Sequence, residues 1–283
     1  MQILQSAPAL QAQTEAWRQE GLRIGLVPTM GALHEGHLQL VRAAAAENDV
    51  VVTSIFVNPT QFNNAEDFRL YPRLPEADAE LLGPAGCTAL FMPSVEQMYP
   101  TQARLRFDFG PLEHVMEGAF RPGHFNGVAT VVSKLFHLAR PHRAYFGQKD
   151  LQQVTIVRQM VADLSFDLEV IPFATVRESD GLAMSSRNRR LSPAERVHAP
   201  HLYKALQLTA TQLRAGHLPA EARQAGVSYL AQEAAIRLEY LEIVDVQTLQ
   251  PITAPLATSH PVAICLAAHL GDVRLIDNII VES

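Results

Sequence analysis

Cysteine is scarce in this chain of 283 residues, and no segment is apolar over a membrane-spanning length. The two cysteines, Cys87 and Cys265, lie in apolar runs without a cysteine or histidine at metal-binding spacing. We expect both thiols to be buried and reduced, which fits the cytosol. The N-terminus has no basic stretch followed by an apolar one, so no signal peptide is expected. These absences predict a soluble cytoplasmic protein without a membrane partner.

Positive charge is not in excess, because 23 Lys and Arg residues face 29 Asp and Glu residues, for a net charge of −6. A nucleic-acid-binding protein should show a strongly basic domain, so we expect no nucleic-acid partner. Lysine itself occurs only at Lys134, Lys149 and Lys204, so a lysine inside a motif stands out. The length allows two domains, and the apolar content of 48% is that of an ordinary globular protein.

Several common catalytic motifs are also absent. The chain has neither the phosphate loop Gly-x-x-x-x-Gly-Lys-Ser/Thr nor Gly-x-Gly-x-x-Gly after its first long apolar run. It has no Gly-x-Ser-x-Gly and no cysteine that looks catalytic. These absences argue against P-loop enzymes, ordinary NAD-binding proteins and enzymes with an activated side-chain nucleophile. A reaction whose nucleophile arrives with the substrate fits better.

The most informative stretch is the segment 28–37, Pro-Thr-Met-Gly-Ala-Leu-His-Glu-Gly-His. It follows the apolar run 22–27 and precedes the segment 38–46, which has the composition of a helix. In α/β proteins a glycine-bearing turn between strand and helix is where free N–H groups and the helix dipole bind phosphate. His34 and His37 add two side-chain donors on one face of the helix start. The alternative is two surface histidines beside a tight turn.

Strands and helices alternate over the first part of the chain. Apolar runs predict strands at 22–27, 49–57, 87–92, 143–146 and 167–171, and helices are expected at 9–20, 38–46, 75–82, 128–138 and 151–164. Segment 67–73 is expected to be a loop, and the Gly- and Pro-containing segment 94–124 a long excursion that covers the site. This order predicts an α/β fold, a Rossmann-like doubly wound parallel sheet, for a nucleotide-binding domain of residues 1–176.

The pattern changes near residue 177, where a polar connector runs to residue 188. Ser192-Pro193-Ala194-Glu195 is a strong helix start. Helices are predicted at about 193–214 and 219–236, and strands at 238–246, 262–269 and 273–281. We therefore predict a second, smaller α+β domain over residues 177–283, which could act as a lid.

Three polar clusters follow predicted strands and would lie at one edge of a parallel sheet. They are the segments 28–37, 58–63 and 147–153; two further clusters, 67–73 and 184–188, lie in connectors. Their imidazoles, lysine, arginine, hydroxyls and carboxylate suit a triphosphate with a metal ion. The plainer alternatives are a salt pair for Lys149 and Asp150 at a helix start and an ordinary linker for Ser185, Ser186 and Arg187.

The turn His34-x-Gly36-His37 resembles the His-x-Gly-His signature of the nucleotidyltransferase superfamily. Taken in order with the segments 58–62, 67–73, 147–153 and 184–188, it makes the whole chain resemble the pantothenate synthetase (pantoate–β-alanine ligase) family. Members of that family adenylate pantoate with ATP, releasing pyrophosphate. The amine of β-alanine then attacks the acyl adenylate to give pantothenate and AMP.

The resemblance implies a set of site residues. His34, His37 and Lys149 would be catalytic, with His37 the usual choice for proton donor. ATP would be bound by Met30, Gly31, Ala32, Leu33, His34, Glu35, Gly36, His37, Gly147, Gln148, Lys149, Asp150, Val176, Met184, Ser185, Ser186 and Arg187. Gln61 would bind both pantoate and β-alanine, and Gln153 would bind pantoate. At Gln148 many members have Glu.

The same resemblance implies Mg²⁺, with ligands that the sequence does not identify, and a homodimer. Two alternatives stay open at this stage. Another nucleotidyltransferase that acts on a phosphorylated substrate would need an additional basic cluster near Gln61 and Gln153. A regulatory protein that binds nucleotide without turnover would not need the intact histidine pair and Lys149.

Overall fold

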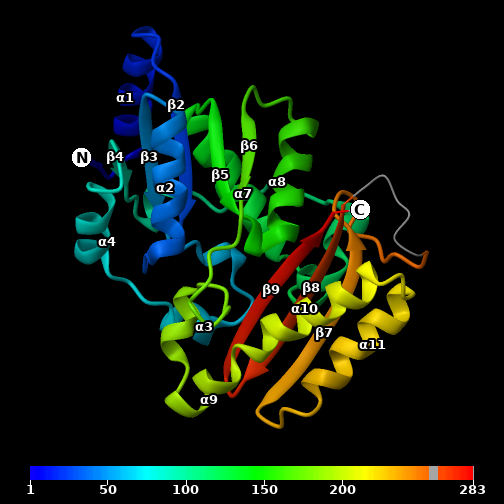
Figure 1. The fold of residues 1–283 in the computed structure, drawn as a ribbon. Coiled ribbons are helices and arrows are strands. Elements are labelled where there is room, and N and C mark those ends of the chain that lie inside the picture. Colours follow the sequence, from blue (N-terminus) through cyan, green and yellow to red (C-terminus); the bar gives the residue numbers. More distant parts are fainter. Residues whose placement is uncertain (255–260, 283) are drawn as a thin grey trace.

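A computed structural model describes residues 1–254 and 261–282 of the chain, so the predicted unit 177–283 includes six internal residues and Ser283 that lie outside the described part. Figure 1 shows a larger α/β part followed by a smaller part with long antiparallel strands. Within the described residues, no helix is long and apolar enough to cross a membrane. Cys87 and Cys265 are both free and buried.

The larger part is a six-stranded, wholly parallel sheet in the order β1-β4-β3-β2-β5-β6. Its strands are β1 (Gln2–Leu4), β2 (Ile24–Thr29), β3 (Val50–Ile55), β4 (Ala89–Phe91), β5 (Arg143–Gly147) and β6 (Glu169–Phe173). The doubly wound parallel sheet predicted from the sequence is therefore confirmed. The prediction missed β1, because three residues at a sheet edge are too short for a periodic pattern.

Helices cover both faces of this sheet, as the nearly all-apolar strands require. One face packs against α1 (Ala7–Gln19), α7 (His124–Ala139) and α8 (Leu151–Asp163), and the other against α2 (Glu35–Glu47) and α4 (Pro75–Leu82). Shorter helical segments are η1 (Pro59–Gln61), α3 (Ala65–Leu70), α5 (Val95–Met98), η2 (Gly110–Glu113), α6 (Met116–Phe120), η3 (Gln148–Asp150) and η4 (Ser186–Arg190).

The smaller part is a three-stranded antiparallel sheet in the order β7-β8-β9, formed by Ile236–Asp245, Val262–Leu270 and Val273–Val281. One face packs against α10 (His201–Arg214) and α11 (Pro219–Leu230). The other face packs on the larger part, where Met116 and Leu151 meet Tyr240 and Val244. The predicted second, smaller α+β unit is thus present, and its sheet lies between its own helices and the parallel-sheet part (Figure 1).

Three predictions of local structure are wrong. Segment 67–73 is not a loop throughout, because Asn64 caps α3 by accepting the backbone N–H of Glu66. The predicted helix 193–214 is divided into α9 (Pro193–His198) and α10, with Pro200 at the junction. The predicted helix 219–236 ends at Leu230, because Ile236 already begins β7.

Segment 94–124 differs in part from the expected excursion over the site. It contains α5, η2 and α6, and Gln152 on α8 donates hydrogen bonds to the carbonyls of Leu112 and Val115. Only its final residues, Arg121 and His124, reach the carbonyl of Gln61. Leu112, Val115 and Met116 pack between the two parts of the molecule, whereas Met98, Tyr99, Phe107 and Phe109 pack against the core of the larger part.

Candidate active site

The strand order places a topological switch point between β2 and β5, because the chain proceeds from β2 toward one sheet edge and from β5 toward the other. Ligands of open parallel sheets bind outside the carboxyl ends of the strands at such a point. A cavity of about 200 Å³ opens there. It is lined by the turns after β2 and β5, by η1, by α7 and by the connector 174–187.

The turn after β2 is held in an uncommon backbone conformation. Gly31 and Ala32 both have positive φ angles, 81° and 52°. The carboxylate of Asp78 on α4 accepts the backbone N–H groups of Ala32 and Leu33 at 2.8 and 2.7 Å. Any side chain at position 31 would bring its Cβ within 3.0 Å of Asp78 and Ile55, so glycine is required there on two grounds.

The rings of the two histidines of the turn lie against each other, with centroids 4.1 Å apart and planes tilted by 39°. Gly36 permits this arrangement, because a Cβ at that position would lie 2.9 Å from the His34 ring. The backbone N–H of His34 contacts His37 Nδ1 at 3.4 Å. Since a backbone N–H only donates, Nδ1 accepts and the neutral His37 ring carries its proton on Nε2.

Both histidines are neutral at pH 7. Burial, with Lys149 and Arg189 nearby, lowers the pKa of His34 to about 4. Burial, His34 and Lys149 lower the pKa of His37 well below its ordinary value. In addition, His34 Nδ1 is buried and has no hydrogen-bond partner among the described residues. Two neutral imidazoles, one with an unused polar atom, are suited to contact an anionic ligand.

Gln61 is set beside this turn by Asn58. The Asn58 amide donates to Gln61 Oε1 at 3.0 Å and to the carbonyl of Gly127 at 3.1 Å, and Gln61 Nε2 contacts the sulfur of Met30. Gly127 on α7 makes the close approach possible, because a Cβ there would lie 2.3 Å from the carbonyl oxygen of Thr60. The Gln61 side chain is thereby oriented and buried.

Two cations, Lys149 and Arg187, also line the cavity. Lys149 lies 3.3 Å from Asp150 and is 17% exposed. Arg187 pairs with Asp67 on α3, and Arg190 pairs with the other oxygen of the same carboxylate. Burial disfavours the charge of Arg187, but Asp67 outweighs burial and raises its pKa. Arg187 therefore stays charged, and its partner is a carboxylate that a phosphate could replace.

The connector after β6 lines the cavity and is bonded to the turn after β2. The Ser186 hydroxyl donates to the carbonyl of Ala32, and Arg189 donates to the carbonyl of Leu33. Both carbonyls belong to the residues whose N–H groups bind Asp78. One turn is thus fixed from two sides, by α4 and by the connector.

Comparison with known proteins places this site in a family. The family model described as pantoate-beta-alanine ligase matches residues 2–280. The chain belongs to this ligase family. It is 51% identical over 259 residues to the pantothenate synthetase of Cytophaga hutchinsonii, covering 91% of each chain, and 50% identical over 279 residues to that of Bacteroides fragilis, covering 99% of this chain and 98% of the relative.

Solved structures of this ligase family have the same fold. The pantothenate synthetase of Thermus thermophilus superimposes with a TM-score of 0.91 at 47% identity, covering 99% of both chains. The pantoate-beta-alanine ligase of Francisella tularensis, described as complexed with Beta-gamma ATP and beta-alanine, gives a TM-score of 0.82 at 35% identity over 99% of this chain and 97% of that one. The family resemblance inferred from the motifs is therefore confirmed.

The structure brings most of the predicted ligase residues to one cavity. Its lining includes Met30, His34, Gly36, His37, Gln61, Gly147, Lys149, Asp150, Gln153, Val176, Met184, Ser185, Ser186 and Arg187. Five predicted ATP-binding residues lie outside the lining. Gly31, Ala32 and Leu33 are buried in the turn, Glu35 pairs with Arg42 on the surface, and the Gln148 carbonyl faces Asn278.

Several residues that organise the site were not assigned a role from the sequence, although Asn58 lies in the predicted cluster 58–63. Asp78 holds the histidine turn, Asn58 orients Gln61, and Arg121 and His124 contact the Gln61 carbonyl. Arg121 brings a positive charge close to Gln61, but it lies 3.5 Å from Glu117 and does not line the main cavity. The sequence did contain a signal for Asp78. It lies four positions before the buried Leu82, so it shares the apolar face of α4, where an acidic side chain needs a partner.

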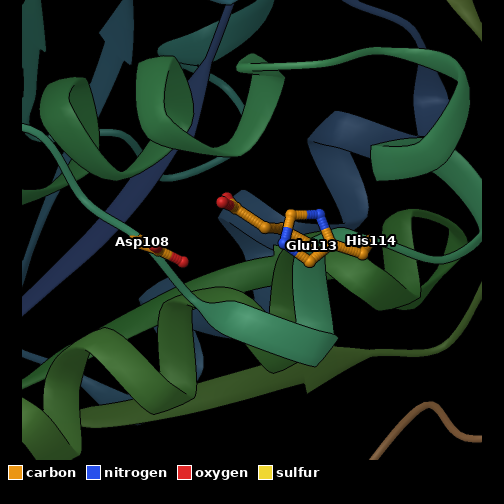
Figure 2. Close-up of side chains that lie close together, drawn as sticks. All are labelled: Asp108, Glu113 and His114. Carbon is orange, nitrogen blue, oxygen red and sulfur yellow. The ribbon is translucent and has the colours of Figure 1, made fainter.

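Among the described residues, the cluster that could offer three metal ligands lies elsewhere. Asp108, Glu113 and His114 have ligand atoms within 4.8 Å of one another. Figure 2 shows these side chains around η2, and none of them lines the cavity. Asp108 also accepts the backbone N–H of Gly110, as turn residues commonly do. The cluster therefore lies outside the candidate active site.

Proposed function

We propose that this chain uses ATP to join pantoate to the amine of β-alanine, through pantoyl adenylate, with release of pyrophosphate and AMP. Membership of the pantoate–beta-alanine ligase family makes it an amide-forming ligase. The observation that carries the proposal is the cavity at the switch point. It combines the donors His34, His37 and Lys149 with the amides Gln61 and Gln153.

In the first step a pantoate carboxylate oxygen attacks the α-phosphorus of ATP, and the bond to the bridging oxygen of pyrophosphate breaks. The carboxylate is already ionised at neutral pH and needs no general base. The barrier arises from bringing two anions together and from the charge on the leaving group. Lys149 and Arg187 would reduce that repulsion as cations, and His34 and His37 would donate N–H groups to phosphate oxygens.

In the second step the neutral amine of β-alanine attacks the acyl carbon, AMP leaves with its phosphate oxygen, and the amine loses its proton. Gln61 would touch pantoate and β-alanine, and Gln153 would touch pantoate. An acyl adenylate hydrolyses readily, so water must be excluded from the cavity. We propose that the unit 177–283 does this for the unit 1–176, since its connector already binds the histidine turn.

A Mg²⁺ ion bound with ATP fits the residues that are present. Mg²⁺ usually takes one or two protein carboxylates and completes its shell with phosphate oxygens and water. Asp150 is the carboxylate among the residues lining the cavity, so it would hold the ion, which would neutralise phosphate charge. Asp67 is a less suitable ligand for the ion, because both of its carboxylate oxygens already form ion pairs with Arg187 and Arg190. We also propose that the protein is cytoplasmic and forms a homodimer.

AMP formation tests the proposed function directly. We expect purified protein to turn over ATP and Mg²⁺ continuously to AMP and pyrophosphate only when both pantoate and β-alanine are present, with pantothenate and AMP formed in equal amount. Pantoate without β-alanine should give no more than a single turnover of pyrophosphate release, because the pantoyl adenylate then has no amine to react with. AMP release that is equally fast with and without β-alanine would overturn the proposal. Omitting pantoate while keeping β-alanine is the matched control for contaminating ATPases.

A further inference from the structure

A strand of the smaller part reaches the turn that carries Lys149. The side-chain amide of Asn278 on β9 donates to the carbonyl of Gln148 at 2.9 Å and to that of Lys149 at 2.8 Å. Asn278 is only 3% exposed. These bonds join the last strand of the chain to the start of α8, where the phosphate-binding lysine is expected.

A buried asparagine at this position is unusual for its surroundings. Ile276 and Ile280, two residues away on either side, share its strand face and pack in the apolar interface between the two parts. Burying an amide costs free energy unless hydrogen bonds compensate for the loss of water. Its Oδ1 has no partner among the described residues, so the two bonds from Nδ2 provide the compensation.

Contacts on the opposite face of β9 hold the strand, and with it Asn278, in place. The carboxylate of its neighbour Asp277 accepts hydrogen bonds from both terminal nitrogens of Arg177, at 2.6 and 3.0 Å. Arg177 also donates to the carbonyl of Asn278 and stacks over the ring of Tyr203 at 3.8 Å. The strand is thereby fixed to the connector between the two parts, and Asn278 can hold the Lys149 turn from a rigid position.

We propose that Asn278 is a positioning residue for ATP, which holds the backbone of the Lys149 turn so that the ammonium group and Asp150 face the cavity. This inference rests on the proposed function, because it assigns ATP to that cavity. Asn278 itself lines no part of the main cavity and touches no reacting atom. The smaller part thus contributes to ATP binding through β9, in addition to closing the cavity.

The test compares Asn278→Leu, which keeps the size of the side chain and removes both donors, with wild type. Titration calorimetry measures affinity for the non-hydrolysable β,γ-imido analogue of ATP and, separately, for pantoate. We expect affinity for the analogue and kcat/KM for ATP to fall about tenfold or more. Affinity for pantoate should stay within twofold, because Gln153 lies within α8, which is anchored by Val154 and Val157.

Ile280→Val is the matched control, because it removes one methylene from the same strand face without touching the turn. It should bind both ligands within twofold of wild type. If Asn278→Leu does not give a native circular dichroism spectrum, Asn278→Ser is judged by the same thresholds. The inference is overturned if an Asn278 variant binds the ATP analogue with an affinity within twofold of wild type. It is also overturned if the variant loses affinity for the ATP analogue and for pantoate by the same factor. Wild type without β-alanine-dependent AMP formation would instead refute the proposed function.

Discussion

At the scale of single residues, the state of the histidine pair determines what it can contribute. His34 and His37 are neutral, and the contact between the His34 backbone and His37 Nδ1 leaves the proton on Nε2. His37 is therefore described better as an N–H donor to phosphate than as an imidazolium acid. An amide side chain can also donate an N–H, whereas a methyl group cannot.

We predict that His37→Ala lowers kcat for AMP formation about 10²–10³-fold, the usual cost of removing one transition-state donor. His37→Gln should retain at least tenfold more activity than His37→Ala, because its amide can still donate. Steady-state kinetics with saturating ATP measure both. An acidic limb near pH 6.5 in wild type that disappears in His37→Gln would contradict the neutral-donor assignment.

The sequence identified the residues that line the cavity better than those that hold them in place. His34, His37, Gln61, Lys149 and Arg187 stand in short polar clusters beside apolar strands, and the structure brings them to one cavity. Asp78 was missed because its partners are backbone groups about 45 positions away in the chain. Asn58 was included only as part of the segment 58–63, because its bond to the carbonyl of Gly127 on α7 could not be read from the sequence. Such partners depend on three-dimensional packing, which a local pattern does not contain.

At the scale of elements, α3 is a weakly anchored segment near the cavity. None of its residues is buried. Asp67 connects it to Arg187 and Arg190 of η4. A helix with little buried surface and few anchoring bonds opens readily.

We predict that Asp67→Ala speeds amide hydrogen exchange in residues 65–70 at least fivefold, because the two ion pairs to η4 are lost. Exchange in α7 and in the parallel strands should be unchanged. Mass spectrometry of peptides from both regions measures this. Glu66→Ala is the control, since Glu66 pairs with Arg69 inside α3; equal acceleration in both variants would contradict the anchoring role of Asp67.

Elements with strong local signals were predicted well. The helix 75–82 and the strands near 262–269 and 273–281 lie within a residue or two of their observed ends. The errors fall where tertiary structure overrides local preference. Segment 231–235 is rich in alanine and polar helix formers, yet it turns so that Ile236 can enter the antiparallel sheet. No local rule gives such an ending.

At the scale of the whole molecule, the contact between the two parts could not be predicted from the sequence. It combines the apolar interface beneath β7 and β8 with a buried ion network. The Glu117 carboxylate on α6 accepts hydrogen bonds from both terminal nitrogens of Arg274 on β9, each at 2.7 Å. It also accepts a hydrogen bond from the hydroxyl of Tyr240 at 2.9 Å. Arg274 also pairs with Glu239 within the smaller sheet. Tyr240 and Arg274 lie more than a hundred positions from Glu117 in the chain, and no motif marks them.

This network gives the stability of the molecule a definite pH dependence. Burial opposes the charge of Glu117, but Arg274, Arg121 and Tyr240 together lower its pKa to about 2. Because the folded-state pKa lies below the ordinary value, the charged carboxylate stabilises the fold above about pH 4.5. That contribution, about 3 kcal/mol, is lost as pH falls from about 4.5 toward 2.

We predict that Glu117→Gln lowers the free energy of unfolding by about 3–5 kcal/mol at pH 7, because Arg274 keeps its buried charge and loses its partner across the interface. Below about pH 4.5 the difference from wild type should shrink, since protonated Glu117 is as uncharged as glutamine. Urea unfolding at pH 7, 4 and 3 measures the difference. Glu239→Gln breaks a pair inside the smaller sheet and should leave the Glu117 contribution intact. A difference between Glu117→Gln and wild type that is the same at pH 7 and pH 3 would show that the charge of Glu117 does not hold the two parts together.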